Sequence, residues 1–486
     1  MKLTLLLILC PFFLFSQVQI GEDIDGIGHS SLSGSAVSLS SDGSVVAIGA
    51  PYSNSSKGLV RIYENVSGVW TQVGSSISGE AFNDYSGESV SLSSDGSIVA
   101  IGAPYNNGNG DRSGHVRVYE NVSGVWMQVG QDIDGEATED LSGSAVSLSL
   151  DGSVIAIGAP LNNGNGDRSG HVRVYKNVSG VWTQVGWDIN GEVDDDVSGI
   201  AVSLSSDGSV VAIGAGSNDN GFDSGHVRIY KNISGVWTQI GSDIDGEATR
   251  DHSGRAVCLS SDGSIVAIGA PENDGNGDRE NCGHVRMFEY VSGAWTQVGN
   301  DIDGGSTNGK SGSSVSLSSD GSIVAIGAPL NNGNGRDSGY VRIYKNVSGV
   351  WTQEGSTMYG EAEGDHSGSA ISLSSDGSVV AIGAPRNNNN YPRSGHVRVY
   401  DTTESLTIEE NNVTVFNIYP NPAQNQVTIQ LQEGLELNQV NIYNTLGQFI
   451  STSKEKVINT SHLSSGLYLL EIETTQGKAT KQLIIE

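Results

Sequence analysis

Paired aspartates are the residues in this sequence whose type and spacing best suit chemistry. The segment DIDGEA occurs twice, at 132–137 and 243–248, and each copy carries two carboxylates two positions apart. Asn- and Asp-rich segments such as NNGNGD and DGNGD occur between the same repeats. Together they offer the oxygen atoms that Ca²⁺ prefers, and they suit a cationic or carbohydrate ligand equally well. The candidate binding residues are therefore Asp132, Asp134, Asp243 and Asp245.

The same residue types have a plainer interpretation. Asn, Asp and Gly are what solvent-facing turns require, because they tolerate unusual backbone angles and bond to their own main chain. The sequence favours this interpretation over a calcium site. We therefore expect no cofactor and no resident metal, and calcium stays an open alternative at the four aspartates.

Histidine is a second residue type that binds metals, and five histidines stand at one equivalent place in successive repeats. Because each belongs to a different copy, we expect them to be spread around the fold and unable to share one ion. A tyrosine, Tyr340, takes this place in a sixth copy. The histidines are His115, His171, His226, His284 and His396.

Catalysis requires unlike residues that converge, such as a nucleophile, a base and a group that orients the base. Near-identical copies instead place the same residue at the equivalent position of every repeat. The few residues that differ between copies form no catalytic set. We therefore expect no enzyme. Two alternatives stay open: an extracellular enzyme that degrades polysaccharide or peptide on an acidic loop face, and a purely structural surface protein.

The repeat itself sets where these residues lie. Asp-Gly turns recur 53, 56, 56, 55, 58 and 56 residues apart, and the tryptophan of VSGVWTQ recurs with the same spacing. A fixed period of this length indicates a repeat architecture. The turn aspartates are Asp42, Asp95, Asp151, Asp207, Asp262, Asp320 and Asp376.

Each repeat is predicted to form four antiparallel strands. In the second copy these are 89–93, 97–103, 115–120 and 125–133. The strands alternate apolar and polar residues or are apolar throughout, and Asp-Gly supplies the turn of a tight hairpin. Four such strands form one blade of a β-propeller, whose two apolar faces are buried by neighbouring blades. The long loops and the links between blades then share one acidic, Asn- and Gly-rich face.

The two ends of the repeat region indicate a closed ring. The seventh copy stops after its third strand at 395–400, whereas VQIGEDIDG (18–26) copies a fourth strand without its tryptophan. We therefore predict seven blades over 17–401, with the N-terminal strand completing the last blade. An open solenoid is the alternative.

The repeat also resembles a known family. SGESVSLSSDGSIVAIGAPYNNGNGDRSGHVRVYE (86–120) is similar to the FG-GAP repeat of integrin-type propellers, with Gly-Ala-Pro in six copies and Gly-Ala-Gly at 214–216. The resemblance implies a propeller. That family's calcium loop carries several acidic residues, whereas this chain has only Ser-Ser-Asp-Gly there. The resemblance therefore does not carry a calcium site.

Composition limits the classes of partner. The chain has 486 residues and a formal net charge of −30, and such an acidic protein is repelled by nucleic acid and by anionic membrane surfaces. Residues 1–16 have the basic start and apolar centre of a signal peptide, and no later stretch is apolar enough to cross a membrane. We expect an exported monomer.

The last residues follow a different pattern. After a polar linker at 402–412, residues 413–486 predict a small β-sandwich of short alternating strands. They resemble the C-terminal sorting domain of type IX secretion cargo in the Bacteroidota. The matching residues are Tyr419, Pro420, Asn421, Pro422, Gly447, Gly466, Tyr468, Lys478 and Lys481.

These observations combine into one prediction of function. The resemblance implies export through the type IX secretion machinery and a place outside the cell, secreted or on the outer-membrane surface. The propeller is predicted to serve there as a binding or adhesion module, with a glycan or a protein as the ligand of its acidic loop face.

Overall fold

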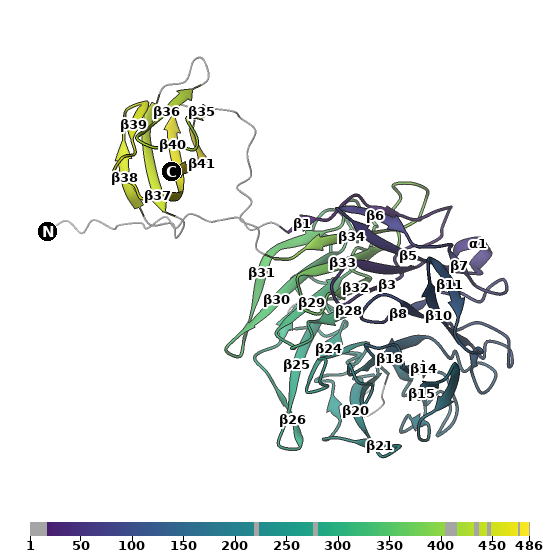
Figure 1. Cartoon of the computed structure of the whole chain (residues 1–486). Coiled ribbons are helices and arrows are strands. Elements are labelled where there is room, and N and C mark those ends of the chain that lie inside the picture. Colours follow the sequence, from purple (N-terminus) through teal and green to yellow (C-terminus); the bar gives the residue numbers. More distant parts are fainter. Residues whose placement is uncertain are drawn as a thin grey trace. The chain divides into compact units, whose positions relative to one another are not determined.

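The computed structural model describes residues 17–217, 223–275, 280–403, 416–431, 437–444, 449–474 and 477–485. The predicted signal peptide (1–16) and most of the predicted linker (402–412) lie outside these residues. The chain divides into two compact units, residues 1–405 and 406–486, which Figure 1 shows in purple to green and in yellow. We call the described residues 17–403 the propeller unit.

The propeller unit is built from antiparallel sheets, which confirms the predicted all-β fold. Its described residues form seven sheets of four or five strands. Innermost strands such as β3, β8 and β28 lie near the middle, and outer strands such as β21 and β26 lie at the periphery (Figure 1). The first strands are β3 (Ala36–Leu39), β8 (Ser89–Leu92), β13 (Ala145–Leu148), β18 (Ser198–Leu204), β23 (Ala256–Leu259), β28 (Ser314–Leu317) and β32 (Ala370–Leu373).

The second and third strands form the buried middle of each sheet, and we name each sheet after its third strand. The second strands are β4 (Val45–Gly49), β9 (Ile98–Ala103), β14 (Val154–Ala159), β19 (Val210–Ala215), β24 (Ile265–Ala270), β29 (Ile323–Ala328) and β33 (Val379–Ala384). The third strands are β5 (Leu59–Val66), β10 (His115–Val122), β15 (His171–Val178), β20 (His226–Ile233), β25 (His284–Val291), β30 (Tyr340–Val347) and β34 (His396–Asp401). A four-residue segment, α1 (Ser53–Ser56), precedes β5, and its residues Asn54, Ser55 and Ser56 have left-handed backbone angles.

The outer strand differs from the prediction of one continuous segment. In most sheets it is broken into a four-residue strand and a two-residue strand that both pair with the third strand. In the β10 sheet the break spans Val129–Asp132 and includes Gly130, whose φ is +76°. The outer strands are β6 (Val69–Gln72), β11 (Val125–Gln128), β16 (Val181–Gln184), β21 (Val236–Gln239), β26 (Ala294–Gln297) and the unbroken β31 (Val350–Tyr359). The short strands are β7 (Ile77–Ser78), β12 (Ile133–Asp134), β17 (Ile189–Asn190), β22 (Ile244–Asp245) and β27 (Ile302–Asp303).

An aspartate closes the first turn of each sheet. In the β10 sheet, Asp95 Oδ1 accepts hydrogen bonds from the Ser97 backbone N–H (2.9 Å) and from the hydroxyls of Ser93 and Ser97. These bonds hold the pKa of the Asp95 carboxyl below its usual range. Gly96 follows with a φ of +69°, a conformation that glycine adopts without strain. The repeated Ser-Ser-Asp-Gly-Ser segment is therefore a structural turn.

The N-terminal segment completes the last sheet, as predicted. Strand β1 (Val18–Gln19) pairs with β34, and so does β2 (Ile24–Asp25). Between them, the Ile20 backbone N–H donates to the Val399 carbonyl at 2.7 Å. Ile24 is 5% exposed and packs with apolar residues of β34 and of the β5 sheet. We call residues 17–26 the closing segment.

A circle of backbone hydrogen bonds joins the seven first turns. Each turn donates one N–H to a carbonyl of the next sheet at 2.7–2.9 Å, and the last turn donates to the first. The predicted alternative of an open solenoid is therefore wrong, because an open array would have no bond from Ser375 to Ser41. The donors, in order, are Ser41, Ser94, Leu150, Ser206, Ser261, Ser319 and Ser375.

A second circle of hydrogen bonds joins the first strands themselves, two residues before the turns, and a cysteine replaces one of its serines. In six sheets a serine hydroxyl oxygen accepts the backbone N–H of a leucine in the next sheet, at 2.9–3.0 Å. In the β25 sheet the acceptor is Cys258 Sγ, which receives the Leu317 N–H at 3.3 Å. Sulfur is the weaker acceptor. The seven leucines line a cavity of 210 Å³ on the axis.

Replacement of this cysteine by serine is expected to stabilise the ring. Cys258→Ser restores the acceptor present in the other six sheets, so it should add about 0.5–1.5 kcal/mol to the free energy of unfolding, the range of one hydrogen bond. Urea unfolding followed by circular dichroism measures this change. Cys258→Ala is the matched control, and it should lower the stability. A Cys258→Ser chain that is no more stable than the unaltered one would contradict the expectation.

In six sheets, a tryptophan of the outer strand donates a hydrogen bond to the sheet before it. The Trp295 indole N–H, for example, donates to the Ile240 carbonyl at 2.8 Å. A Cβ at Gly241 would lie 2.6 Å from the Trp295 ring, so only glycine allows this approach. The same bond occurs at six tryptophans, Trp70, Trp126, Trp182, Trp237, Trp295 and Trp351. The tryptophans thus hold the sheets together.

The second unit is a two-sheet sandwich with its own core. One sheet contains β35 (Phe416–Tyr419), β36 (Gln426–Leu431) and β39 (Val457–Asn459). The other contains β37 (Leu437–Asn444), β38 (Phe449–Ser453), β40 (Gly466–Thr474) and β41 (Gly477–Ile485). Apolar side chains from both sheets, including Val427, Val440, Leu470 and Leu483, are fully buried between them. The predicted β-sandwich is therefore present.

Candidate functional site

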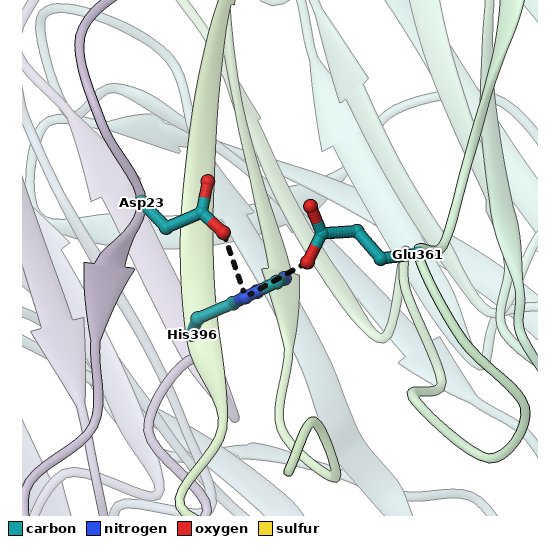
Figure 2. Close-up of side chains that lie close together, drawn as sticks. All are labelled: Asp23, Glu361 and His396. Carbon is teal, nitrogen blue, oxygen red and sulfur yellow. Dashed lines mark ion pairs between the residues drawn. The ribbon is translucent and has the colours of Figure 1, made fainter. Parts of the chain in front are cut away.

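Five clusters of one histidine and two carboxylates recur around the propeller unit. In each cluster one histidine nitrogen and one oxygen of each carboxylate all lie within 4.8 Å of one another. Figure 2 shows the cluster of Asp23, Glu361 and His396, in which the imidazole faces both carboxylates. The other four are Glu80–His115–Asp132, Glu136–His171–Asp188, Glu192–His226–Asp243 and Glu247–His284–Asp301. We name each cluster after its histidine.

Two neighbouring sheets supply each cluster. The histidine is the first residue of a third strand, and the aspartate follows the outer strand of the same sheet. The glutamate follows the short strand of the sheet before or, for Glu361, the unbroken β31. In the His115 cluster, these are His115 at the start of β10, Asp132 after β11, and Glu80 after β7. The site is therefore assembled across the boundary between two sheets.

The distances within the clusters are longer than hydrogen bonds. His115 Nδ1 lies 3.5 Å from Asp132 Oδ2. His396 Nδ1 lies 3.3 Å from Asp23 Oδ2 and 3.8 Å from Glu361 Oε2. In the His171 and His284 clusters, Nδ1 lies 3.9 Å from the glutamate Oε2. The Nδ1 atom thus faces carboxylate oxygens in each of these four clusters without a short contact.

A glutamine fixes each aspartate of the clusters. In the His115 cluster, Gln128 Nε2 donates to Asp132 Oδ1 at 2.6 Å, which leaves Oδ2 toward the imidazole. Gln19 holds Asp23 in the same way at 2.7 Å. The glutamine always stands four residues before the aspartate, and the remaining pairs are Gln184–Asp188, Gln239–Asp243 and Gln297–Asp301.

The glutamates also face a buried arginine. Arg173 Nη1 lies 3.6 Å from Glu136 Oε1, and the equivalent pairs in the other four clusters are 3.6–3.8 Å apart. The arginine stands two residues after the histidine, and its other nitrogen, Nη2, donates to a backbone carbonyl of the sheet before, here that of Asp134 at 2.6 Å. Each site therefore holds two carboxylates, one guanidinium and one imidazole.

Burial lowers the pKa of four of the imidazoles. The five histidines are 0–1% exposed, and burial lowers the pKa of His171 and of His284 to about 4. Burial also lowers the pKa of His115 and His226. In the described part of the chain, Nε2 of all five rings has no hydrogen-bond partner, nor does Nδ1 of His226 and His396.

The four aspartates predicted as binding residues have two different roles. Asp132 and Asp243 belong to the His115 and His226 clusters. The side chains of Asp134 and Asp245 are exposed and belong to none of the five clusters in the described residues, and their carbonyls accept bonds from arginines. Calcium binding at these four residues stays a prediction.

The pairing of histidines with carboxylates is not among the sequence-based predictions. The histidines lie in separate repeats, as predicted, but each has carboxylate neighbours that the repeat pattern does not indicate. The glutamates were missed because each comes from the sheet before. A comparison of the copies position by position would have found the sets.

The Asn-rich loops have a structural role. Asn106 is 5% exposed, and its amide donates to Asp84, a residue of the link that follows β7. Asn273–Asp251 and Asn387–Asp365 repeat this bond at 3.0–3.1 Å. The first asparagine of these loops therefore joins two sheets.

Grooves lie at the periphery between successive sheets. One has a volume of 590 Å³ and the next 440 Å³. Each is lined by a half-buried tryptophan, an aromatic residue of the third strand, and the two aspartates of the preceding link. The lining residues are Trp295, Phe288, Asp243 and Asp245 in the first groove, and Trp351, Tyr344, Asp301 and Asp303 in the second.

The predicted sorting residues lie on the strands and turns of the sandwich. Asn421 Oδ1 accepts the Ile484 backbone N–H at 2.8 Å, which ties the YPNP segment (419–422) to the last strand. Tyr468 donates to the Ser464 carbonyl, and Lys481 to Asn417. Gly466 begins β40, and Lys478 lies in β41. Gly447 lies outside the described residues.

Residues 417–486 match the family model described as the secretion system C-terminal sorting domain. This segment is a C-terminal sorting domain. The domain indicates export by the type IX secretion system, hence a place outside the cell, secreted or at the cell surface. None of the described helices has the length and apolar character needed to span a membrane.

The propeller unit is similar to solved β-propellers. Hydrazine synthase of Kuenenia stuttgartiensis is 14% identical, with a TM-score of 0.51 over 80% of this chain and 99% of that chain. A putative 6-phosphogluconolactonase of Bacteroides uniformis is 13% identical, with a TM-score of 0.49 over 68% and 86%. At such identities the likeness to the synthase shows the fold alone. No curated protein matches the sequence, and the resemblance to FG-GAP repeats stays a prediction.

Proposed function

We propose that the propeller unit is an extracellular binding or adhesion module, delivered by type IX export, and that it catalyses no reaction. The observation that carries this proposal is the repetition of one groove lining between successive sheets. The two grooves present equivalent sites to one ligand, and two linked weak contacts give a higher overall affinity than either alone. A polymer of repeated units suits such a surface.

The groove lining favours a glycan as this polymer. Aromatic rings such as Trp351 and Tyr344 offer apolar surface, and the carboxylates beside them accept hydrogen bonds from hydroxyl groups. The net charge of −30 repels polyanions. We therefore propose a neutral or cationic glycan, and no nucleic acid.

An array of glycans and proteins, probed with the whole exported chain, tests this function. Asp245→Asn combined with Asp303→Asn should lower the affinity for a bound glycan about tenfold, because a hydrogen bond to a charged group contributes ~1.5 kcal/mol. Glu120→Gln combined with Glu289→Gln removes the same charge from exposed strand positions outside the two grooves and should leave the affinity unchanged. Binding to proteins alone would show that the ligand is a protein and not a glycan. No binding anywhere on the array would favour the alternative of a purely structural surface protein.

A further inference from the structure

We propose that each of the five histidine–carboxylate clusters binds one divalent first-row transition-metal ion through the histidine Nδ1, the aspartate and the glutamate. This inference is drawn from other observations than the proposed glycan binding, although Asp243 and Asp301 belong both to a cluster and to a groove lining. Imidazole nitrogen with two carboxylates suits ions such as Zn²⁺ or Co²⁺, whereas Ca²⁺ and Mg²⁺ prefer all-oxygen sites. The inference therefore concerns a different class of ion from the calcium considered for the aspartate pairs.

The separations between the ligand atoms fit an ion better than direct bonds. The nitrogen–oxygen distances of 3.3–3.9 Å exceed those of hydrogen bonds, which lie at 2.7–3.2 Å. Two ligands held about 2.1 Å from one tetrahedral Zn²⁺ stand roughly 3.4 Å apart. In four clusters the imidazole thus stands too far from a carboxylate oxygen for a hydrogen bond and near the spacing of two ligands of one ion. In all five clusters the three ligand atoms lie within 4.8 Å of one another.

The surroundings are those of a built site. Metal-binding carboxylates are usually held by a further hydrogen bond, and in all five clusters a glutamine donates one to aspartate Oδ1. In the His115 and His396 clusters, the other oxygen, Oδ2, faces the imidazole. The histidines are buried, and both ring nitrogens of His226 and His396 have no hydrogen-bond partner in the described residues. An uncompensated buried polar group costs free energy, which a bound ion at Nδ1 would offset.

The copies that lack a cluster lack all three of its members. In the β5 sheet, Leu59 replaces the histidine, Ser76 the aspartate and Ile27 the glutamate. In the β30 sheet the corresponding replacements are Tyr340, Thr357 and Gly305. The glutamine and the arginine are kept in both sheets, as Gln72 and Arg61 and as Gln353 and Arg342. The three residues therefore vary as one unit, separately from the arginine that faces the glutamate.

The arginine does not exclude a cation. It approaches glutamate Oε1, whereas Oε2 faces the imidazole in the His171, His284 and His396 clusters. Two carboxylates and one guanidinium together carry a formal charge of −1 at each cluster, which suits a cation. Three protein ligands also leave one position for water or for an oxygen of another molecule.

Zinc titration of the whole exported chain, stripped with a chelator, tests the inference. We expect five Zn²⁺ per chain by elemental analysis after gel filtration, and a melting temperature that rises with Zn²⁺ because the ion binds only the folded ring. His171→Leu combined with Asp188→Ser should bind four. Leucine and serine already stand at the equivalent positions of the β5 sheet, as Leu59 and Ser76. The fold therefore accommodates both substitutions. Asp111→Asn, an exposed loop change outside the clusters, should still bind five.

A spectroscopic measurement keeps the test independent of the variant's folding. Titration of the unaltered chain with Co²⁺ should give visible absorption bands of tetrahedral nitrogen and oxygen coordination, saturating at five equivalents. Zinc content that is the same in the His171→Leu, Asp188→Ser chain as in the unaltered chain would overturn the proposal. A Co²⁺ spectrum no different from that of the free ion would overturn it as well.

Discussion

Removal of residues 406–486 is expected to reduce the extracellular amount of the protein to background while the propeller unit still folds. The first unit has its own buried cores and its own ring closure. The sorting domain, in contrast, is the part of the chain recognised for type IX export. Fractionation of cells that have this secretion system, followed by immunoblotting, measures the distribution of the shortened chain.

A fusion provides the matched control for this deletion. Residues 402–486 joined to an unrelated periplasmic protein should carry that protein out of the cell, because the sandwich has a core of its own. A shortened chain that reaches the medium in the normal amount would contradict the assigned role of the domain. Loss of export without loss of the propeller fold would support it.

Deletion of the closing segment is expected to destabilise the propeller unit strongly. Without residues 17–26, β34 loses the partner that β1 and β2 provide, and Trp70 loses the Ile20 carbonyl that accepts its indole N–H. Burial of an isoleucine such as Ile24 is worth about 1.5–3 kcal/mol, and each lost hydrogen bond adds ~1 kcal/mol. The total loss is therefore several kcal/mol, and an unpaired sheet edge favours aggregation.

Thermal unfolding and gel filtration measure this effect, and a peptide supplies the control. A synthetic peptide of residues 17–28 added to the shortened chain should restore much of the melting temperature by pairing with β34. The same peptide with Ile24→Asp should not, because it would bury a charge. Equal melting temperatures for the shortened and complete chains would contradict the closing role of this segment.

The fold could be predicted from the sequence because its information is repeated and local. The Asp-Gly turn, the alternating strands and the tryptophan recur in register, so each copy confirms the others. The last copy lacks an outer strand and the segment 18–26 is a surplus one, which together predict that the ring closes in the last sheet. The break in the outer strands was missed, because Gln128 and Ile133 both carry strand-like sequence and only the bend at Gly130 separates them.

The candidate site could be predicted only in part. Asp132 and Asp243 were selected for their carboxylates, but the partners expected for them were loop oxygens rather than histidines. A cluster such as that of His115 joins residues from two sheets, and its glutamate, Glu80, precedes the repeat that holds the imidazole. Spacing within one copy cannot show such a contact. The simultaneous loss of all three members in two copies is the signal in the sequence that was overlooked.

The pairing of the first strand with the last has a consequence for biosynthesis. Residues 17–26 leave the ribosome before any other part of the ring, yet their partner β34 is made after all the other sheets. Contacts between such distant segments form slowly, so the newest chain waits with an unmatched strand at its start. A polypeptide shortened by early termination or by a protease lacks β34, and its first strand then has no strand to pair with. The ring thereby distinguishes a finished molecule from a fragment.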